Sequence, residues 1–407
     1  MTAGFSPDRS DPETLDCAAS AEVEAPVHDP ATTLASLGAP QVEVVRTEEA
    51  MNGLAPHWDL VLASSRCNNV FLTWAWISTW WQVYGGRQRL HIIVVRAGDG
   101  TIIGIAPLKR RRLGPLGGDV VSFLGTGSDV TPEYLDFIIV EGLEALVLGM
   151  VVRELVEDPT IAAIDLYPVA DDSANIAYVT GALAERPGVL KRRKGAVCPF
   201  LALPPTIEDF RLSRSRNYRK KIGEFERRCD RGLSARLRQT STHAEVAADL
   251  ATLKALHRMR WNGRSRAFRS EQYLEFHKRF ARLAFDRGWL RLYSLETAAT
   301  PMAVVYGFLY KGRYYFYQSG RDPRFTRQRP GLVLMHKVIQ EAIREGAAVF
   351  DFLSGDEAYK NRWANGRLFG FRISYWKSTS AWAVSMCRDG LATMVKVPRR
   401  LFPAETD

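Results

Sequence analysis

The sequence predicts a mixed α/β (α+β) protein of two halves, each a largely antiparallel sheet flanked by helices. Strand-like and helix-like segments alternate in the first half. The second half has three strand-like segments in a row, followed by a loop, a helix and another strand. The length of 407 residues leaves room for two domains of ordinary size.

Composition excludes several classes of protein. Hydrophobic residues make up 46% and charged residues 25%, which is ordinary for a globular chain and rules out global disorder. The longest apolar stretch, residues 145–152, is far shorter than the ~20 residues that cross a bilayer. Residues 1–29 lack the apolar core of a signal peptide, so a cytoplasmic protein without a transmembrane segment is expected.

Cysteine spacing points to free thiols rather than to a disulfide framework or a structural zinc site. The five cysteines are scattered along the chain, and no CxxC pair or Cys/His cluster occurs. We therefore expect no bound metal.

Charge is distributed unevenly over the chain, whose net charge is +10. Residues 1–49 contain ten acidic and two basic residues, and residues 1–40 lack periodicity, which predicts a disordered acidic segment. The rest of the chain is strongly basic. That excess favours an anionic partner, or it reflects only a general preference for arginine.

The first half, residues 41–203, opens with a strand at 41–45 and an aromatic helix at 69–81 that Thr73 caps. A hairpin follows, with strands 90–96 and 102–108 around a Gly-Asp-Gly turn. The remaining expected elements are strands at 120–124, 134–140 and 161–167 and a helix at 143–157.

The second half, residues 204–385, begins with a basic segment. Residues 211–238 hold eleven basic and three acidic residues, with apolar side chains at helical spacing, which predicts an amphipathic helix with a basic outer face. Further helices are expected at 243–261 and 270–287. A meander of three strands follows, at 289–295, 302–310 and 313–319. Next come a loop at 320–330, a helix at 331–345 and strands at 348–353 and 371–376, and residues 386–407 form a tail.

The helix predicted from Gly331 starts directly after a loop. Helix amino ends present unpaired N–H groups and a positive dipole, which suits a phosphate. Pro330 fits the first helical position, and Gly331 allows a ligand to approach the backbone closely.

Several stretches resemble the GNAT-superfamily acetyltransferases of the BioF2-like, cellulose-biosynthesis-associated (CelD-type) group, which are related to the FemAB aminoacyltransferases. The most specific stretches are Tyr317-Gln-Ser-Gly320, Pro330-Gly-Leu-Val-Leu334 and Phe350 to Trp363; weaker ones lie at 71–81, 107–112, 123–127 and 134–137. The resemblance covers about residues 45 to 380. It implies two GNAT-like halves and acyl transfer from acetyl-CoA or another acyl-CoA.

The family's pyrophosphate loop has the form Q/R-x-x-G-x-G/A, and Gln328 and Gly331 match it. Val333 stands where the family has a small residue, which puts close backbone approach there in question. The resemblance assigns cofactor binding to Arg327, Gln328, Arg329, Gly331 and Leu332.

An acidic and aromatic cluster follows the strand at 348–353. In GNAT chemistry an amine loses a proton before it attacks the thioester, and Asp356 or Glu357 is the expected base. Tyr359 is the expected acid for the leaving thiolate. The alternative is structural, with Asp351 and Lys360 forming an ion pair.

Acceptor binding is expected from residues on both halves: Asp129, Tyr134, Asp351, Lys360 and Arg362. The segment 125–129, with Glu133, Tyr134 and Asp136, is expected either to select the acceptor in the cleft between the halves or to be an ordinary loop. His257 is expected to pack rather than to catalyse. Cys198 has no nearby histidine in the sequence and is expected to be a buried strand thiol rather than a nucleophile.

Three functions compete. The first is acyl-CoA-dependent N-acyltransfer, most simply N-acetylation, to an amine of a sugar or amino-acid-like molecule, in keeping with the family's association with exopolysaccharide. The acceptor would be a small molecule or a polysaccharide precursor, without specific nucleic acid. The second is Fem-type transfer from aminoacyl-tRNA to a peptidoglycan precursor, for which the basic helix would suit tRNA. The third is a binding protein that keeps the fold without catalysis.

Overall fold

The computed structural model describes residues 38–113, 118–261, 265, 267–298, 300–383, 385 and 386. Most of the predicted acidic segment at 1–40 and of the tail at 386–407 lies outside these residues.

The amino-terminal half contains short helices and two sets of strands. In order, its elements are β1 (Gln41–Val45), α2 (Glu48–Gly53), α3 (Ala55–Ala63), η1 (Val70–Leu72), α4 (Trp74–Tyr84), η2 (Gly85–Arg87), β2 (Arg89–Leu90), β3 (Ile92–Arg96), β4 (Ile102–Ala106), β5 (Leu108–Arg112), β6 (Asp119–Phe123), β7 (Ile138–Ile139), α5 (Glu144–Glu157), β8 (Ile161–Ala170), α6 (Ala174–Ala184) and β9 (Val189–Ala202).

The carboxy-terminal half contains a meander followed by a 15-residue helix, nine of whose residues are buried. In order, its elements are α7 (Ile207–Leu212), α8 (Arg216–Leu233), β10 (Arg236–Gln239), α9 (His243–Trp261), α10 (Glu271–Asp286), β11 (Leu290–Glu296), β12 (Pro301–Tyr310), β13 (Arg313–Arg321), η3 (Pro323–Gln328), α11 (Pro330–Arg344), β14 (Val349–Asp351), α12 (Ala358–Asn361) and β15 (Gly366–Trp376).

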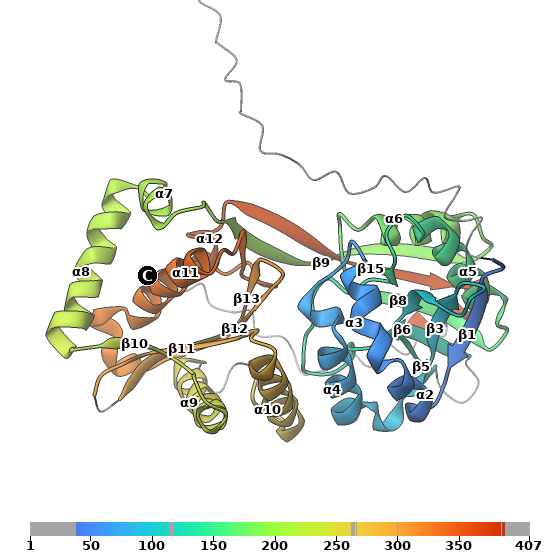
Figure 1. Ribbon diagram of the computed structural model, residues 1–407. Helices are drawn as coiled ribbons and strands as arrows, with labels where there is room; N and C mark the ends of the chain where they lie inside the picture. Colours follow the sequence, from blue (N-terminus) through green and yellow to red (C-terminus); the bar gives the residue numbers. More distant parts are fainter. Residues whose placement is uncertain are drawn as a thin grey trace, which may run out of the picture.

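One mixed sheet of 11 strands runs through both halves, in the order β10-β11-β12-β13-β14-β9-β15-β8-β6-β5-β2. The long antiparallel strands β9 and β15 bridge the two lobes (Figure 1). A separate four-stranded sheet, β1-β3-β4-β7, lies in the amino-terminal half. These mixed sheets flanked by helices confirm the predicted fold class. The division at residue 203 stays a prediction.

Thr73 caps α4 as predicted: its hydroxyl accepts from the N–H of Trp76. The predicted hairpin forms between β3 and β4, and the meander forms from β11 to β13. The strand at 371–376 lies between β9 and β8, so it also joins the sheet of the amino-terminal half.

Two predicted elements differ from the structure. The strand at 134–140 is reduced to Ile138–Ile139, and Tyr134, where the predicted strand begins, has a left-handed backbone with φ of 56° rather than an extended one. The basic helix at 211–238 is divided into α7, α8 and β10. Ser215 caps the start of α8, and a left-handed Ser234 (φ 50°) ends it.

Aromatic packing joins the two halves. Trp76 of α4 is fully buried, and its ring meets those of Phe276 and Phe280 on α10 edge to face, at 4.8 and 4.7 Å between centroids. Such pairs add to the free energy of apolar burial. This contact holds the halves together on one side of the bridging strands.

We predict that Trp76→Ala lowers the free energy of unfolding by about 3–5 kcal/mol, because it leaves a cavity between α4 and α10. The matched control is Leu60→Ala on α3, where the side chain is 66% exposed. That change should cost less than about 0.5 kcal/mol. Urea unfolding of both variants checks this, and equal losses would contradict the packing role of Trp76.

Candidate functional site

The parallel pairing of β13 with β14 is short. Three residues of each strand pair, from Arg313 opposite Val349 to Tyr315 opposite Asp351. β13 then continues for six residues to Arg321, with a bulge in its pairing to β12 near Tyr317. In the described residues no strand pairs with that edge of β13 beyond Tyr315, so the sheet opens there.

α11 begins close to this opening. Its first residue is Pro330, and the residue before it, Arg329, adopts a left-handed backbone with φ of 51°. The N–H groups of Leu332 and Val333 both donate to the carbonyl of Arg329. The Gly331 N–H has no hydrogen-bond partner in the described part of the chain, which leaves a donor at the positive end of the helix dipole.

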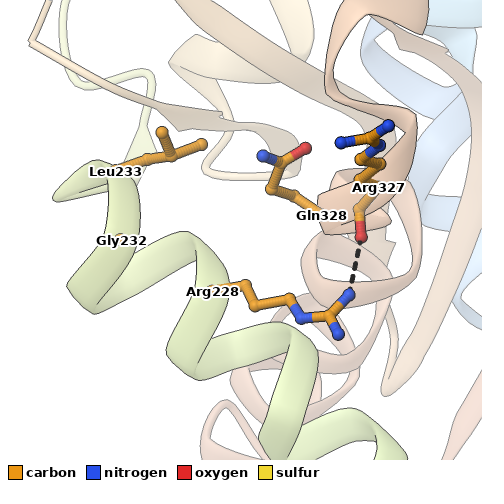
Figure 2. Close-up of a pocket in the computed structure, with 5 residues that line it drawn as sticks. All are labelled: Arg228, Gly232, Leu233, Arg327 and Gln328. Carbon is orange, nitrogen blue, oxygen red and sulfur yellow. Dashed lines mark hydrogen bonds between the residues drawn. The ribbon is translucent and has the colours of Figure 1, made fainter.

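A groove of about 430 Å³ lies beside this loop, between α8 and η3 (Figure 2). Its lining residues are Arg228, Gly232, Leu233, Arg327 and Gln328. Arg228 donates to the backbone carbonyl of Arg327 at 3.2 Å, which ties α8 to the loop. The amide oxygen of Gln328 is buried and has no partner among the described residues. The orphaned oxygen atom can accept a hydrogen bond from a donor group of a ligand, and the two neighbouring arginines suit anionic groups.

The structure therefore brings the five predicted cofactor residues together. Arg327 and Gln328 line the groove, and Arg329, Gly331 and Leu332 form the turn into α11. The side chain of Val333, which departs from the family pattern, is fully buried in the core beneath α11.

Asp351, at the end of the β13–β14 pairing, is fully buried. It accepts from Arg313 at 2.9 Å, from the backbone N–H of Leu353 at 2.8 Å and from the hydroxyl of Tyr134 at 3.2 Å. Burial raises the pKa of Asp351, and the charge of Arg313 opposes that rise. Tyr134 belongs to the amino-terminal half, so this cluster joins the halves at the opening of the sheet.

Glu133 lies beside this cluster and is 5% exposed. Burial raises the pKa of Glu133 to about 7; a hydrogen bond with Ser354 opposes the rise, the charge of Asp351 adds to it, and Lys360 opposes it. A carboxyl group that titrates near neutrality can accept and release a proton at physiological pH.

The loop after β14 is shaped by Gly355, whose φ is 124°. A Cβ there would lie 2.3 Å from the Glu357 Oε2 atom and 2.8 Å from the Lys360 Nζ atom, so a larger residue would strain the backbone and displace both side chains. Lys360 is 4% exposed; it donates to the carbonyl of Ser354 at 2.6 Å and pairs with Glu357 at 3.0 Å. The expected alternative of an Asp351–Lys360 ion pair is wrong, because each residue has a different partner.

The other residues of the predicted catalytic cluster lie further out. Asp356 is exposed and accepts from the side chain of Asn361 at 2.8 Å. Tyr359 is half-buried, with the guanidinium of Arg260 at 5.2 Å from its ring. Arg362 is exposed. Of the predicted bases, only Glu357 contacts the buried Lys360.

Asp129 is held elsewhere. It accepts from Tyr84 on α4 and from Ser270, the residue that caps α10, so it connects the two halves in a structural role. His257 lies 3.0 Å from the carbonyl of Ser319, in agreement with the predicted packing role. Burial raises the pKa of the Cys198 thiol well above its usual value, which agrees with an unreactive thiol.

Two residues of the cluster lie outside the predicted catalytic set: Glu133, which the sequence suggested only for selection of the acceptor, and Arg313. Both stand in strand-like or loop segments with unremarkable neighbours. Only the pairing of distant segments, 133–134 with 351–354 and 313 with 351, brings them to the opening. No local pattern in the sequence signals it.

Comparison with known proteins agrees with this geometry. Residues 216–361 match the family described as an acetyltransferase (GNAT) domain, and they include the loop, α11 and the segment up to α12. No curated protein matches the chain.

Solved structures share the overall fold. A crystal structure of FemX is similar with a TM-score of 0.55 and 12% identity, over 84% of this chain and 98% of that one. A conserved protein of unknown function from Bacteroides thetaiotaomicron VPI-5482 is similar with a TM-score of 0.51 and 11% identity, over 83% and 100% of the two chains. At these identities the likeness shows the fold alone.

No helix in the described part of the chain is both long and apolar enough to cross a membrane. The described residues contain no group of three histidine, cysteine or acidic side chains placed to hold a metal ion.

We predict that Gly355→Ala costs about 1–3 kcal/mol of stability through backbone strain and also displaces the Glu357–Lys360 pair. The matched control is Gly346→Ala, at φ of 74° with no atom within 4 Å of the added Cβ. It should cost about 1 kcal/mol. Unfolding measurements check this, and a smaller loss at position 355 than at 346 would refute the steric argument.

The pKa of Glu133 also predicts a pH dependence of stability. A carboxyl group with a raised pKa in the folded state binds its proton more tightly there than in the unfolded chain. The free energy of unfolding should therefore fall as pH rises from about 4.5 to about 7, by on the order of 3 kcal/mol from this group.

Glu133→Gln should remove the part of the decrease in unfolding free energy that this carboxyl group causes. Asp136→Asn is the control, because burial raises the pKa of Asp136 only to about 6. Titration of Asp136 therefore changes the free energy of unfolding over a pH range that ends lower than that of Glu133. Urea unfolding from pH 4.5 to 8 measures both. An unchanged slope between pH 6 and 7 in Glu133→Gln would contradict the account.

Proposed function

We propose that the protein is an acyl-CoA-dependent N-acyltransferase, most simply an N-acetyltransferase, acting on an amine of a sugar or amino-acid-like molecule. The observation that carries this proposal is the opening between β13 and β14, followed at once by a loop and the amino end of α11, within the residues that match the acetyltransferase domain.

The residues at the loop fit the diphosphate of coenzyme A. A Cβ on Gly331 would meet only the Cδ atom of Arg321, at 3.5 Å, so the space above this residue is not filled by protein in the described structure. The Gly331 N–H, the NH2 group of the Gln328 amide and the side chains of Arg327 and Arg329 would donate to the phosphate oxygens. When bound, the thioester supplies an activated acyl group.

Glu133 is proposed as the base. Its carboxylate takes a proton from the ammonium group of the acceptor; the freed amine nitrogen bonds to the thioester carbon, and the carbon–sulfur bond breaks. The thiolate takes a proton from Tyr359, which stays the predicted donor, and the second proton that the nitrogen loses on forming the amide returns to Tyr359. The N–H groups along the unpaired edge of β13 beyond Tyr315 would stabilise the developing oxyanion.

Glu133 is favoured over Glu357 and Asp356 by its surroundings. Glu357 is held by Lys360, and Asp356 is exposed to solvent, whereas Glu133 is buried at the opening with a pKa of about 7. Lys360, Asp351 and Arg313 would position the acceptor and keep the local charge balanced. A role in polysaccharide or cell-envelope biosynthesis remains part of the proposal.

A second candidate function is transfer from an aminoacyl-tRNA, as in Fem-type enzymes. It is favoured by the basic outer face of α8, where Arg216, Lys220, Lys221, Arg227 and Arg231 are exposed. Binding to coenzyme A-agarose and to tRNA at ~0.15 M salt distinguishes the two donors, because weak phosphate contacts are largely screened there.

We predict that Gly331→Asp abolishes acetyl-CoA binding, because a carboxylate would face the diphosphate. Gly331→Ala is the control and should fold normally, since its Cβ meets only an ordinary contact. Calorimetry measures both affinities. Wild-type affinity in Gly331→Asp would eliminate the loop as the donor site.

We also predict that Glu133→Gln lowers kcat/KM by about 10²–10⁴-fold and removes the acid limb of the pH–rate profile near pH 7. Acetyl-CoA affinity should stay near the wild-type value. Asp136→Asn changes a nearby buried carboxyl that Ser173 holds, and it should keep the acid limb. Survival of the limb in Glu133→Gln would exclude Glu133 as the base.

A further inference from the structure

A row of polar side chains crosses five neighbouring strands in the amino-terminal half. Lys191 of β9, Ser374 of β15, Asp165 of β8, Ser122 of β6 and Lys109 of β5 are successive cross-strand partners. Directly opposite residues share one face of a sheet. The residues next to them in the strands, among them Ile164, Ile373 and Val121, point to the other face and form the core.

A second row lies beside the first. Arg193 of β9 is directly opposite Arg372 of β15, and the guanidinium of Arg372 lies 5.7 Å from the ring of Tyr167 on β8. Both rows cross the three strands β9, β15 and β8. We call their six residues on these strands the polar sheet face: Lys191, Arg193, Ser374, Arg372, Asp165 and Tyr167.

Positive charge exceeds negative charge on the polar sheet face. Its one carboxylate, Asp165, accepts from Arg372 at 2.7 and 2.5 Å and from the hydroxyl of Ser374 at 2.9 Å. Arg193 makes no hydrogen bond or ion pair within the described ranges, although it stands opposite another arginine. Like charges opposite each other destabilise a sheet unless an anion lies between them.

The other groups on the face suit a sugar. Tyr167 is 37% exposed and offers an aromatic surface on which an apolar sugar face can stack. Asp165 and Ser374 offer oxygen atoms for sugar hydroxyls. Arg193 and Lys191 offer charge-assisted donors that match a phosphate.

The polar sheet face is next to the cluster at the opening. The backbone N–H of Leu135, two residues after Glu133, donates to the carbonyl of Pro168, which follows Tyr167. The Glu133 charge also contributes to the raised pKa of Tyr167, after burial. Tyr167 and Arg193 are two strands apart, about 10 Å across the sheet. A ligand on this face can therefore reach Glu133 with one end.

We propose that the polar sheet face binds the acceptor, and that the acceptor is an amino sugar carrying a phosphate group, with the phosphate at Arg193 and Lys191 and the amine toward Glu133. The identification of this ligand as the acceptor rests on the proposed function. The binding site itself is testable without it.

The test compares Arg193→Glu with Lys194→Glu. The two substitutions make the same charge change at adjacent positions of β9, but alternation places Lys194, opposite Phe371, on the other face. Calorimetry measures binding of glucosamine 6-phosphate, glucosamine and inorganic phosphate to the full chain. Arg193→Gln is included in case the acidic variant pairs with Arg372 and alters the face.

The wild type should bind glucosamine 6-phosphate at least about ten-fold more tightly than glucosamine. Arg193→Glu and Arg193→Gln should lose about ten-fold or more of this affinity, and Lys194→Glu less than about two-fold. Equal losses at positions 193 and 194, or no preference of the wild type for the phosphorylated sugar, would overturn the proposal.

Acetyl-CoA affinity, measured on the same variants, separates the two proposals. It should be unchanged in all of them, because the polar sheet face lies outside the loop at α11. If the sugar phosphate binds as expected and acetyl-CoA does not bind the wild type, the proposed function fails and the sugar site stands. If acetyl-CoA binds and the sugar site fails, only this inference is lost.

Discussion

The early end of the pairing between β13 and β14 is the constraint on which the rest of the site depends. Three residue pairs join the strands, and beyond Tyr315 the backbone donors of β13 face no strand in the described residues. Unpaired backbone groups inside a protein need partners. A ligand that extends along this edge can supply them, and the amino end of α11 offers it a place for negative charge.

The opening is kept in shape by buried charge. Asp351, with no exposed surface, is held by Arg313 and by Tyr134 from the other half of the chain. A buried carboxylate without these partners would be costly, so the two halves are fixed to each other at this point. The same low-polarity surroundings raise the pKa of Glu133 toward neutrality. The burial that makes these partners necessary for Asp351 thus also shifts the pKa of Glu133.

Local sequence pattern was sufficient for much of the fold, since capping at Thr73, the hairpin and the meander depend on neighbouring residues. It also predicted that the chain passes at Gln328 into a helix that begins near Gly331, whereas cofactor binding at this loop stays a prediction. It failed where distant segments pair: β15 inserts between β9 and β8, and Glu133 and Arg313 meet Asp351 only through this topology. Tyr134, where a predicted strand begins, has a left-handed backbone, which alternation of side chains does not reveal.

The most direct test of the account is a crystal structure of the protein with coenzyme A bound. We expect the diphosphate at the Gly331 N–H, beside Gln328 and Arg329, and the sulfur atom between β13 and β14, on the side of Glu133. Coenzyme A bound at another surface, or an opening filled by side chains in the presence of saturating ligand, would contradict the account.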